Sequence, residues 1–188
     1  MFDIEVQNIV ASVTLGKSFD LDEICEILDG AEYEPEKFRG VIFKLRKPGI
    51  RTSVLIFGSG KMVCTGAKYE KEIYGTVEYL KGTLEDKGID VLDEPDIQIQ
   101  NIVATTDLEG TLNLTSLAIS LGLEKTEYEP EQFPGLVYRM NDPKLVMLFF
   151  GSGKVVCTGG KNLDDIKKGV EKVYGELIKT GLLYEKNN

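Results

Sequence analysis

The sequence predicts an α+β fold of two tandem repeats, in which helices cover one face of an antiparallel sheet. The chain of 188 residues contains several segments twice, in the same order. Segments with the residue pattern of strands outnumber those with the pattern of helices. The connections between successive strands are too short for the crossovers that parallel strands need, so the strands should pair antiparallel.

The duplication is clearest in a hairpin. Residues 55–66 return as 148–159, and from Gly58 onward the copies differ only at Met62, which is Val155 in the second copy. Residues 7–11 return unchanged as 100–104, and 33–40 return as 128–135 with two substitutions. The offset is 93, then 95, then 93 residues, as expected when loops vary on a duplicated fold. Two copies favour a closed pair related by a pseudo-two-fold axis over a solenoid.

The elements of the first half follow from local pattern. Residues 4–11 predict a strand, and residues 18–28 a short helix with Asp20 as N-cap and Gly30 beyond its end. Short strands are expected near 31–34, 41–46, 53–57 and 62–66, followed by an amphipathic helix over 69–87. The second half has helical counterparts at 115–121 and 162–182.

These elements define the expected domains. The first repeat is residues 1–89, and residues 90–99 are the linker and start of the second repeat, acidic and containing Pro95. The second repeat is residues 100–184, and residues 185–188 form a short polar tail.

Composition limits the function. With 31 acidic and 22 basic residues the net charge is −9, so nucleic-acid binding would need cations gathered on one face. There is no histidine, the commonest general base and metal ligand, so no enzyme, metal or cofactor is expected. The three cysteines form no CxxC pair and should be small buried hydrophobes. No run is apolar enough to span a bilayer and no signal peptide is evident, so a cytoplasmic, nucleoid-associated protein is expected.

Strand alternation separates two faces of the sheet. Val54, Ile56 and Cys64 suit packing against helices. The opposite set should form an open face although most of it is apolar, which implies a partner. In the first half this set is Asn8, Val10, Leu55, Phe57, Val63 and Thr65, and in the second half it is Asn101, Val103, Leu148, Phe150, Val156 and Thr158.

The expected rim of this open face is basic. It comprises Lys44, Arg46, Lys47, Arg51 and Lys61 in the first half, and Arg139, Lys144 and Lys154 in the second. A partner with anionic edges and an apolar, acceptor-bearing centre fits this pattern, and the minor groove of A·T-rich DNA is such a partner. The lysines at the helices, Lys68, Lys71, Lys167 and Lys168, are expected to be solvated surface.

The paired Gln-Asn-Ile-Val segments, Tyr-Glu-Pro-Glu-x-Phe loops and Ser-Gly-Lys-x-Val-Cys-Thr-Gly hairpins closely resemble the TATA-binding protein family. The resemblance covers essentially the whole chain, in order and twice over. The similarity of the halves and the acidic composition resemble the archaeal form. The resemblance implies one saddle-shaped, ten-stranded antiparallel sheet with four helices on its convex face.

The implied function is that of a general transcription initiation factor. It would bind double-stranded, TATA-like promoter DNA in the minor groove, bend it, and recruit transcription factor B and then RNA polymerase. A homodimer of the DNA-free protein is a further assembly that the sequence allows. Arg39 follows Phe38 in the first half, whereas Pro134 follows Phe133 in the second. This difference between the halves would help to set the orientation of the protein on DNA.

The resemblance also implies residue roles. The DNA-intercalating wedges are Phe38, Phe57, Phe133 and Phe150. The bases and groove are contacted by Asn8, Val10, Leu55, Val63, Thr65, Asn101, Val103, Leu148, Val156 and Thr158. The phosphates are contacted by Lys44, Arg51, Lys61, Arg139 and Lys154. Transcription factor B is contacted by Glu129, Glu131 and Gln132.

Other interpretations are less consistent with the pattern. The Gly-Ser-Gly-Lys turns lack the GxxxxGK[ST] spacing and the following helix of a nucleotide-binding loop. The phenylalanines could each be core residues, but they recur at duplicated positions. A duplicated DNA-binding or ligand-binding module of similar fold without promoter specificity remains the alternative. An enzyme acting on a small molecule would have no histidine and no paired carboxylates on the open face.

Overall fold

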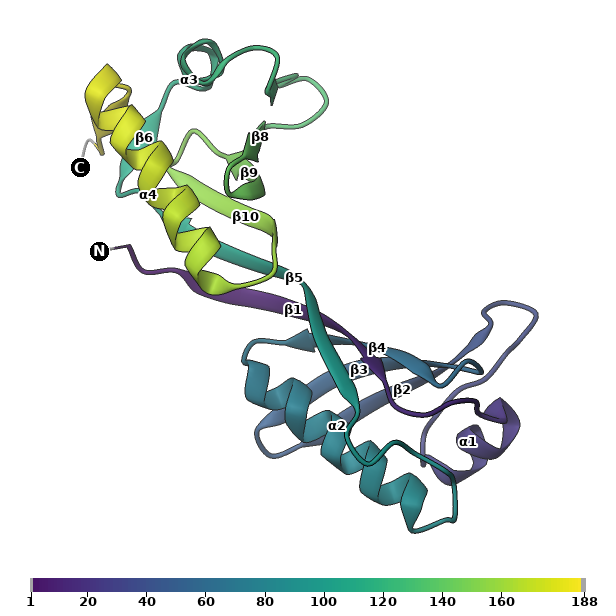
Figure 1. Cartoon of the computed structure of the whole chain (residues 1–188). Coiled ribbons are helices and arrows are strands. Elements are labelled where there is room, and N and C mark those ends of the chain that lie inside the picture. The colour runs from purple at the N-terminus through teal and green to yellow at the C-terminus, as the bar shows by residue number, and fades with distance from the viewer. Residues whose placement is uncertain (1, 187–188) are drawn as a thin grey trace. The chain divides into compact units, whose positions relative to one another are not determined.

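The computed structural model describes residues 2–186 and has the expected α+β composition (Figure 1). Its helices are α1 (Leu21–Ile27), α2 (Glu70–Glu85), α3 (Leu114–Leu121) and α4 (Leu163–Thr180). Its strands are β1 (Glu5–Thr14), β2 (Gly40–Lys47), β3 (Ile50–Phe57), β4 (Lys61–Ala67), β5 (Asp96–Asp107), β6 (Gly110–Leu112), β7 (Thr126–Glu127), β8 (Leu136–Asn141), β9 (Lys144–Phe149), β10 (Lys154–Gly160) and β11 (Leu183–Glu185). Over the described residues, the main sheet has nine strands rather than ten, and a separate small sheet pairs β11 with β6.

Contacts divide the chain into two compact units. The N-terminal unit is Asn8–Gln100, and the C-terminal unit combines the residues up to Gln7 with those from Asn101 onward. The units therefore follow the sequence repeats, except that the start of β1 belongs with the second repeat. Each unit is described separately below.

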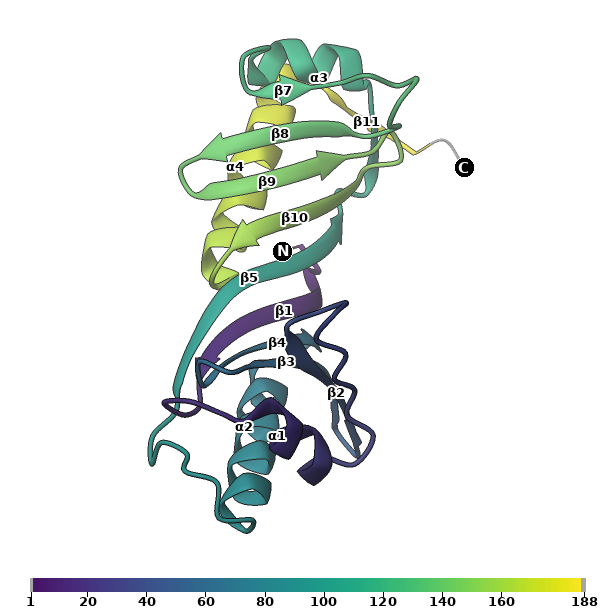
Figure 2. The same cartoon turned by 90° about the vertical axis from the view of Figure 1, so that its right-hand side faces the viewer.

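In the N-terminal unit the antiparallel strand order is β2-β3-β4-β1. Helix α2 packs against β3 and β4, and α1 packs against β2 and α2 (Figure 2). The predicted N-cap is confirmed, because the Asp20 carboxylate accepts hydrogen bonds from the backbone N–H groups of Asp22 and Glu23 at 3.1 and 3.2 Å. The cap sets where α1 begins.

The core of this unit is built from alternate strand residues and one helix stripe. Val54, Ile56 and Cys64 are fully buried, as their alternation predicts. From α2, the residues Ile73 and Leu80 are fully buried on the same side. Each large aliphatic side chain buried in this way stabilises the fold by about 1.5–3 kcal/mol. The burial fixes which face of each strand turns away from the helices.

The C-terminal unit repeats this architecture with the strand order β5-β10-β9-β8-β7. Helix α4 packs against β9 and β10, and α3 against β7 and β8. No helix within residues 2–186 has both the length and the apolar character needed to cross a lipid bilayer.

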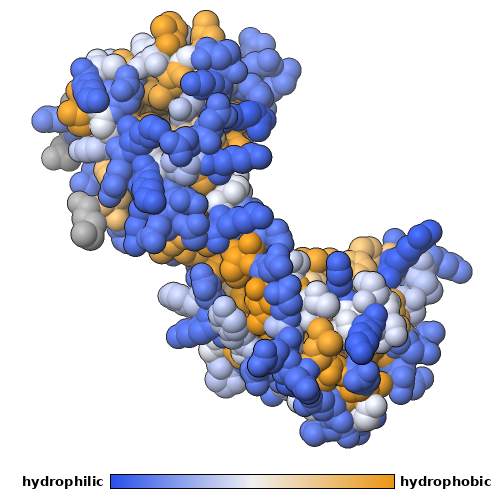
Figure 3. Space-filling model, in the orientation of Figure 1, coloured by the Kyte–Doolittle hydropathy of each residue, from blue (hydrophilic) through white to orange (hydrophobic). Residues whose placement is uncertain are grey.

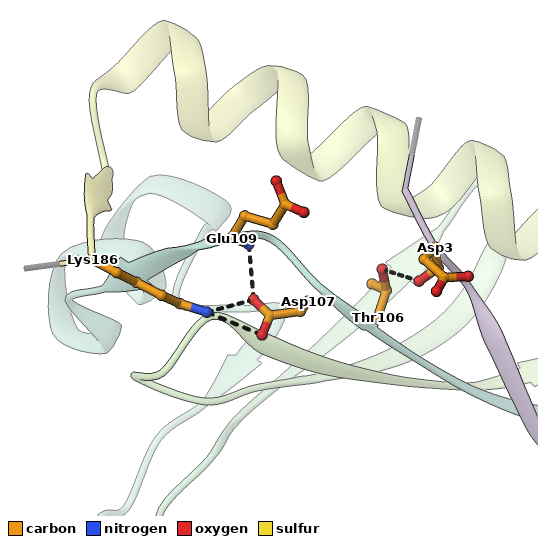
Figure 4. A network of polar contacts seen from close by, with 5 residues as sticks. All are labelled: Asp3, Thr106, Asp107, Glu109 and Lys186. Atoms are coloured by element: carbon orange, nitrogen blue, oxygen red, sulfur yellow. Dashed lines mark hydrogen bonds and ion pairs between the residues drawn. The ribbon is translucent and has the colours of Figure 1, made fainter. Parts of the chain in front are cut away.

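The small sheet of the C-terminal unit was not expected. Leu183 pairs with Leu112, and Lys186 just beyond β11 forms an ion pair of 2.9 Å with Asp107 (Figure 4). The Lys186 ammonium and the backbone N–H of Glu109 both stabilise the Asp107 carboxylate, which lowers its pKa. In the same view the Thr106 hydroxyl donates to the Asp3 carbonyl at 2.8 Å. These contacts connect the two terminal segments to the end of β5.

Two of the cysteines have the predicted role of buried hydrophobes, whereas Cys25 is half-buried. Burial raises the pKa of Cys64 to about 11 and the pKa of Cys157 to about 12. At pH 8 the reactive thiolate is therefore about one part in a thousand or less at both sites.

We predict that the native protein at pH 8 gives at most one fast-reacting thiol with an aromatic disulfide reagent, because only Cys25 has solvent access. Absorbance of the released thiolate measures the stoichiometry, and the denatured chain, with all 3 cysteines accessible, is the control. Rapid reaction of a second thiol in the native protein would contradict the burial of Cys64 and Cys157.

Candidate nucleic-acid interface

The sheet of the N-terminal unit has an open face, formed by the strand residues that point away from α1 and α2. Val10, Leu55, Val63 and Thr65 are half-exposed, whereas their neighbours along the strands are mostly buried. Leu55 lies directly opposite Val63 in the β3–β4 register. The predicted separation of the two faces is thus confirmed for this unit.

The C-terminal unit has the corresponding open face. Val103, Leu148, Val156 and Thr158 are half-exposed, and Leu148 lies opposite Val156 in the β9–β10 register. The surface seen in Figure 3 is mainly hydrophilic, with hydrophobic patches between the polar side chains. Half-exposed aliphatic side chains that gather on one sheet face indicate a surface for a partner.

An asparagine is fixed in the same way on each open face. The Asn8 Oδ1 accepts the backbone N–H of Gly66 at 2.7 Å, where the β1–β4 register shifts, and its Nδ2 donates to the Thr65 hydroxyl at 3.3 Å. The Asn101 Oδ1 accepts the N–H of Gly159 at 2.7 Å, with its Nδ2 3.1 Å from the Thr158 hydroxyl.

The backbone N–H determines the orientation of each amide. An N–H can only donate, so the amide atom that faces it must be Oδ1, and the other amide atom is Nδ2. Nδ2 has two hydrogens and Thr65 or Thr158 takes one of them. Each amide therefore presents a donor to a partner on this face.

A pair of phenylalanine rings lies at the end of each sheet. The centroids of Phe38 and Phe57 are 5.9 Å apart at an interplanar angle of 65°, and those of Phe133 and Phe150 are 5.9 Å apart at 72°. Both pairs have the edge-to-face geometry favoured by aromatic quadrupoles. Phe133 is 40% exposed. The sequence-predicted pairs are thus brought together within each unit.

Sequence reasoning missed the glycine beneath each ring pair. A Cβ on Gly40 would lie 2.8 Å from Phe38 and 3.1 Å from Phe57, and a Cβ on Gly135 would lie 2.7 Å from Phe133 and 3.1 Å from Phe150. A side chain at either position would push the rings apart. The repeated Phe-x-Gly pattern was the available signal.

The Gly-Ser-Gly turn holds the β3–β4 hairpin against the segment that follows β1. The Gly60 N–H donates to the Phe57 carbonyl at 3.1 Å, and the Gly60 carbonyl accepts the N–H groups of Leu15 and Gly16. A Cβ on Gly60 would lie 2.0 Å from the Gly16 carbonyl oxygen. The glycine is therefore required sterically, and Gly153 makes the same approach to Gly110.

The predicted phosphate contacts are all exposed, namely Lys44, Arg51, Lys61, Arg139 and Lys154. Lys61 and Lys154 begin β4 and β10 directly after the tight turns. The Arg139 Nε is already 3.3 Å from the Glu127 carboxylate, in an exposed ion pair.

The residues predicted to contact transcription factor B lie in the loop before Phe133, and Glu129, Glu131 and Gln132 are exposed there. The equivalent loop of the N-terminal unit contains an ion pair between Lys37 and Glu34. Gln132 replaces this lysine in the second loop, so the charge of Glu129 is not balanced in the same way.

Comparisons with known proteins agree with this geometry. The model of the family described as "Transcription factor TFIID (or TATA-binding protein, TBP)" matches residues 3–86 and 96–180. The TATA-box-binding protein of Thermoplasma volcanium is 54% identical over 180 residues, which cover 96% of this chain and 97% of that protein. The TATA-box-binding protein of Methanothermobacter thermautotrophicus is 51% identical over 181 residues, covering 96% and 98%.

A solved structure gives the same result at the level of the fold. The structure of Methanococcus jannaschii TBP superposes with a TM-score of 0.85 at 48% identity, covering 94% of this chain and 99% of that chain. The family model matches once in each half, as the duplicated strands and helices require. The chain belongs to the TATA-binding protein family, and its relatives here are archaeal.

Proposed function

We propose that this protein is a general transcription initiation factor that binds TATA-like promoter DNA in the minor groove. The observation that carries the proposal is the open face of each unit, where half-exposed aliphatic residues, an oriented asparagine and a phenylalanine pair recur with the same geometry. The name shared by its relatives supports the same function. We also propose that the protein has no enzymatic role.

The chemistry of the face suits an A·T-rich minor groove. There A·T and T·A pairs present only the acceptors adenine N3 and thymine O2, and the Asn8 and Asn101 amides can donate to these. Val63, Val156 and their neighbours offer no acceptor to the 2-amino group of guanine. Buried against them, that group would lose its hydrogen bonds to water, which costs about 1–3 kcal/mol.

The phenylalanine pairs are the proposed wedges. A rigid ring inserted between base pairs replaces lost stacking and loses little side-chain entropy on binding. Phe57 and Phe150 extend from the ends of the sheets, and Phe38 and Phe133 pack against them. Insertion would unstack base steps and kink the duplex, by the roughly 80° known for the family.

The cations supply the part of the binding that does not depend on sequence. Lys44, Arg51, Lys61, Arg139 and Lys154 would neutralise phosphates and release counterions, so affinity should fall steeply with salt. Arg139 would have to exchange Glu127 for a phosphate. The net charge of −9 makes the affinity depend on these local cations rather than on the whole molecule.

The loop with Glu129, Glu131 and Gln132 is the proposed contact for transcription factor B, which would bring RNA polymerase indirectly. Its exposed carboxylates suit arginine and lysine side chains of a partner. The first loop, with Lys37 paired to Glu34, offers a weaker acidic surface. This difference would let transcription factor B bind the loop of the C-terminal unit in preference to the loop of the N-terminal unit.

The function is tested by band shifts on A·T-rich and G·C-rich duplexes of equal length at several salt concentrations. We expect the A·T-rich duplex to bind roughly 10³-fold tighter or more, as in specific protein–DNA complexes. Equal affinity at every salt concentration would leave a ligand-binding or DNA-binding module without promoter specificity as the function.

The wedges are tested by Phe57→Ala and Phe150→Ala, measured by fluorescence energy transfer between the ends of an A·T-rich duplex. We expect a smaller bend with little change in the association rate, because the ring acts after encounter. Lys61→Ala is the control, and it should weaken binding to all sequences and reduce the salt slope by about one unit while keeping the bend. An undiminished bend in both phenylalanine variants would refute the wedge assignment.

A further inference from the structure

The halves differ in charge at the hairpin between β2 and β3. In its register Arg46 lies directly opposite Arg51. Like charges in opposed positions of an antiparallel pair destabilise it. The corresponding pair of the β8–β9 hairpin is Asn141 and Lys144. The first hairpin thus keeps a repulsion that the second hairpin avoids.

This hairpin and the start of α2 form a groove of about 690 Å³ within the N-terminal unit. Its apolar lining includes Pro48, Ile50 and Tyr69, and Tyr69 is 63% exposed. Its cationic lining comes from Arg46, Lys47, Arg51, Lys68 and Lys71. The groove therefore combines apolar residues, called its floor below, with cationic residues, called its rim.

The one carboxylate in the groove is already engaged. Glu72 is 8% exposed, and its oxygens accept the backbone N–H groups of Arg51, Lys68 and Tyr69 at 3.1, 3.1 and 3.2 Å. Its side-chain oxygens are directed at the backbone rather than at the cationic side chains.

Acidic side chains do not compensate four of the five cations of the rim. Within residues 2–186, no ion pair joins Arg46, Lys47, Arg51 or Lys71 to a carboxylate. The Arg46 guanidinium instead donates to the carbonyls of Leu45 and Thr52 at 2.9 and 2.7 Å, and the Lys47 Nζ lies 3.9 Å above the Tyr79 ring. These contacts orient the cations without neutralising them.

The second half shows that the shared fold does not need this charge. Asp142 and Asp164 stand where the first half has Lys47 and Lys71. Each aspartate lies near a lysine of α4, at 3.9 Å from Lys172 and 4.0 Å from Lys167. The second hairpin is also two residues shorter, with Asp142 and Pro143 in place of the four residues from Lys47 to Ile50.

We propose that the groove binds an acidic segment of a protein partner, with carboxylates on the rim and an apolar side chain on the floor. Charge complementarity argues for an anionic partner. A protein segment fits better than DNA for two reasons. Lys71 belongs to α2 and Lys47 lies over the α2 residue Tyr79, so these two cations are on the helix side of the sheet, whereas Arg51 is left to the phosphate contact assigned above. The floor also suits an aliphatic or aromatic side chain rather than a phosphate.

The test uses a fluorescent synthetic peptide that alternates Asp and Glu with Leu and Phe, with anisotropy as the readout. The groove variant combines Lys47→Asp with Lys71→Asp, which are the residues that the second half tolerates. The matched control combines Lys168→Asp with Lys179→Asp, two exposed lysines of α4, for the same change in net charge. Melting temperatures verify that both variants fold, and Lys71→Asp alone is used if the double variant does not.

We expect the groove variant to bind the peptide roughly tenfold more weakly than the control, with affinity for an A·T-rich duplex equal in the two variants. A peptide with Asn and Gln in place of the acids should not bind. Equal peptide affinity in both variants, or no binding to the parent protein, would overturn the proposal. So would a selective loss of duplex binding in the groove variant, because it would assign the groove to DNA. Failure of the duplex experiments on the parent protein would instead count against the proposed function alone.

Discussion

The burial of alternate strand residues against the helices is the constraint on which the rest of the structure depends. Val54, Ile56 and Cys64 have no solvent exposure because α2 covers them, so Leu55 and Val63 must turn to the other side. A register slip of one residue would exchange the two sets and bury Thr65 in place of Cys64. The half-exposed aliphatic face is therefore a direct consequence of core packing, and it is stable only as long as the helices remain docked.

Duplication makes the two halves controls for each other. The ring pairs have the same 5.9 Å separation and both asparagines have the same 2.7 Å bond to a backbone N–H, in segments whose sequences are nearly the same in the two halves. Features kept in both halves are those a quasi-symmetric partner such as a duplex would require. Features that differ between the halves, such as the cationic groove and the replacement of Lys37 by Gln132 in the acidic loop, suit partners that distinguish one end of the protein from the other.

Much of the fold and the face could be predicted because both follow from local periodicity. Alternation separated Leu55 from Ile56, and helical spacing located α2 and α4. The strands β6 and β11 were missed because three residues carry no pattern, and their pairing depends on tertiary contact. Gly40 was missed because its role is to leave room for Phe38 and Phe57. Lys68 and Lys71 are exposed, as expected, but exposure alone does not reveal that a hairpin distant in sequence brings Arg46 and Arg51 to the same groove.

The central claim is that the apolar face reads the minor groove, and replacing A·T by inosine·cytosine pairs tests it most directly. Inosine lacks the 2-amino group of guanine, so this pair has the major groove of G·C and a minor groove resembling that of A·T. Equilibrium affinities should be measured for three duplexes that differ only in the central element. We expect the affinity for the inosine duplex to lie within about tenfold of the affinity for the A·T duplex. The G·C duplex should bind with a free energy less favourable by several kcal/mol. An inosine duplex that binds as weakly as the G·C duplex would contradict the account.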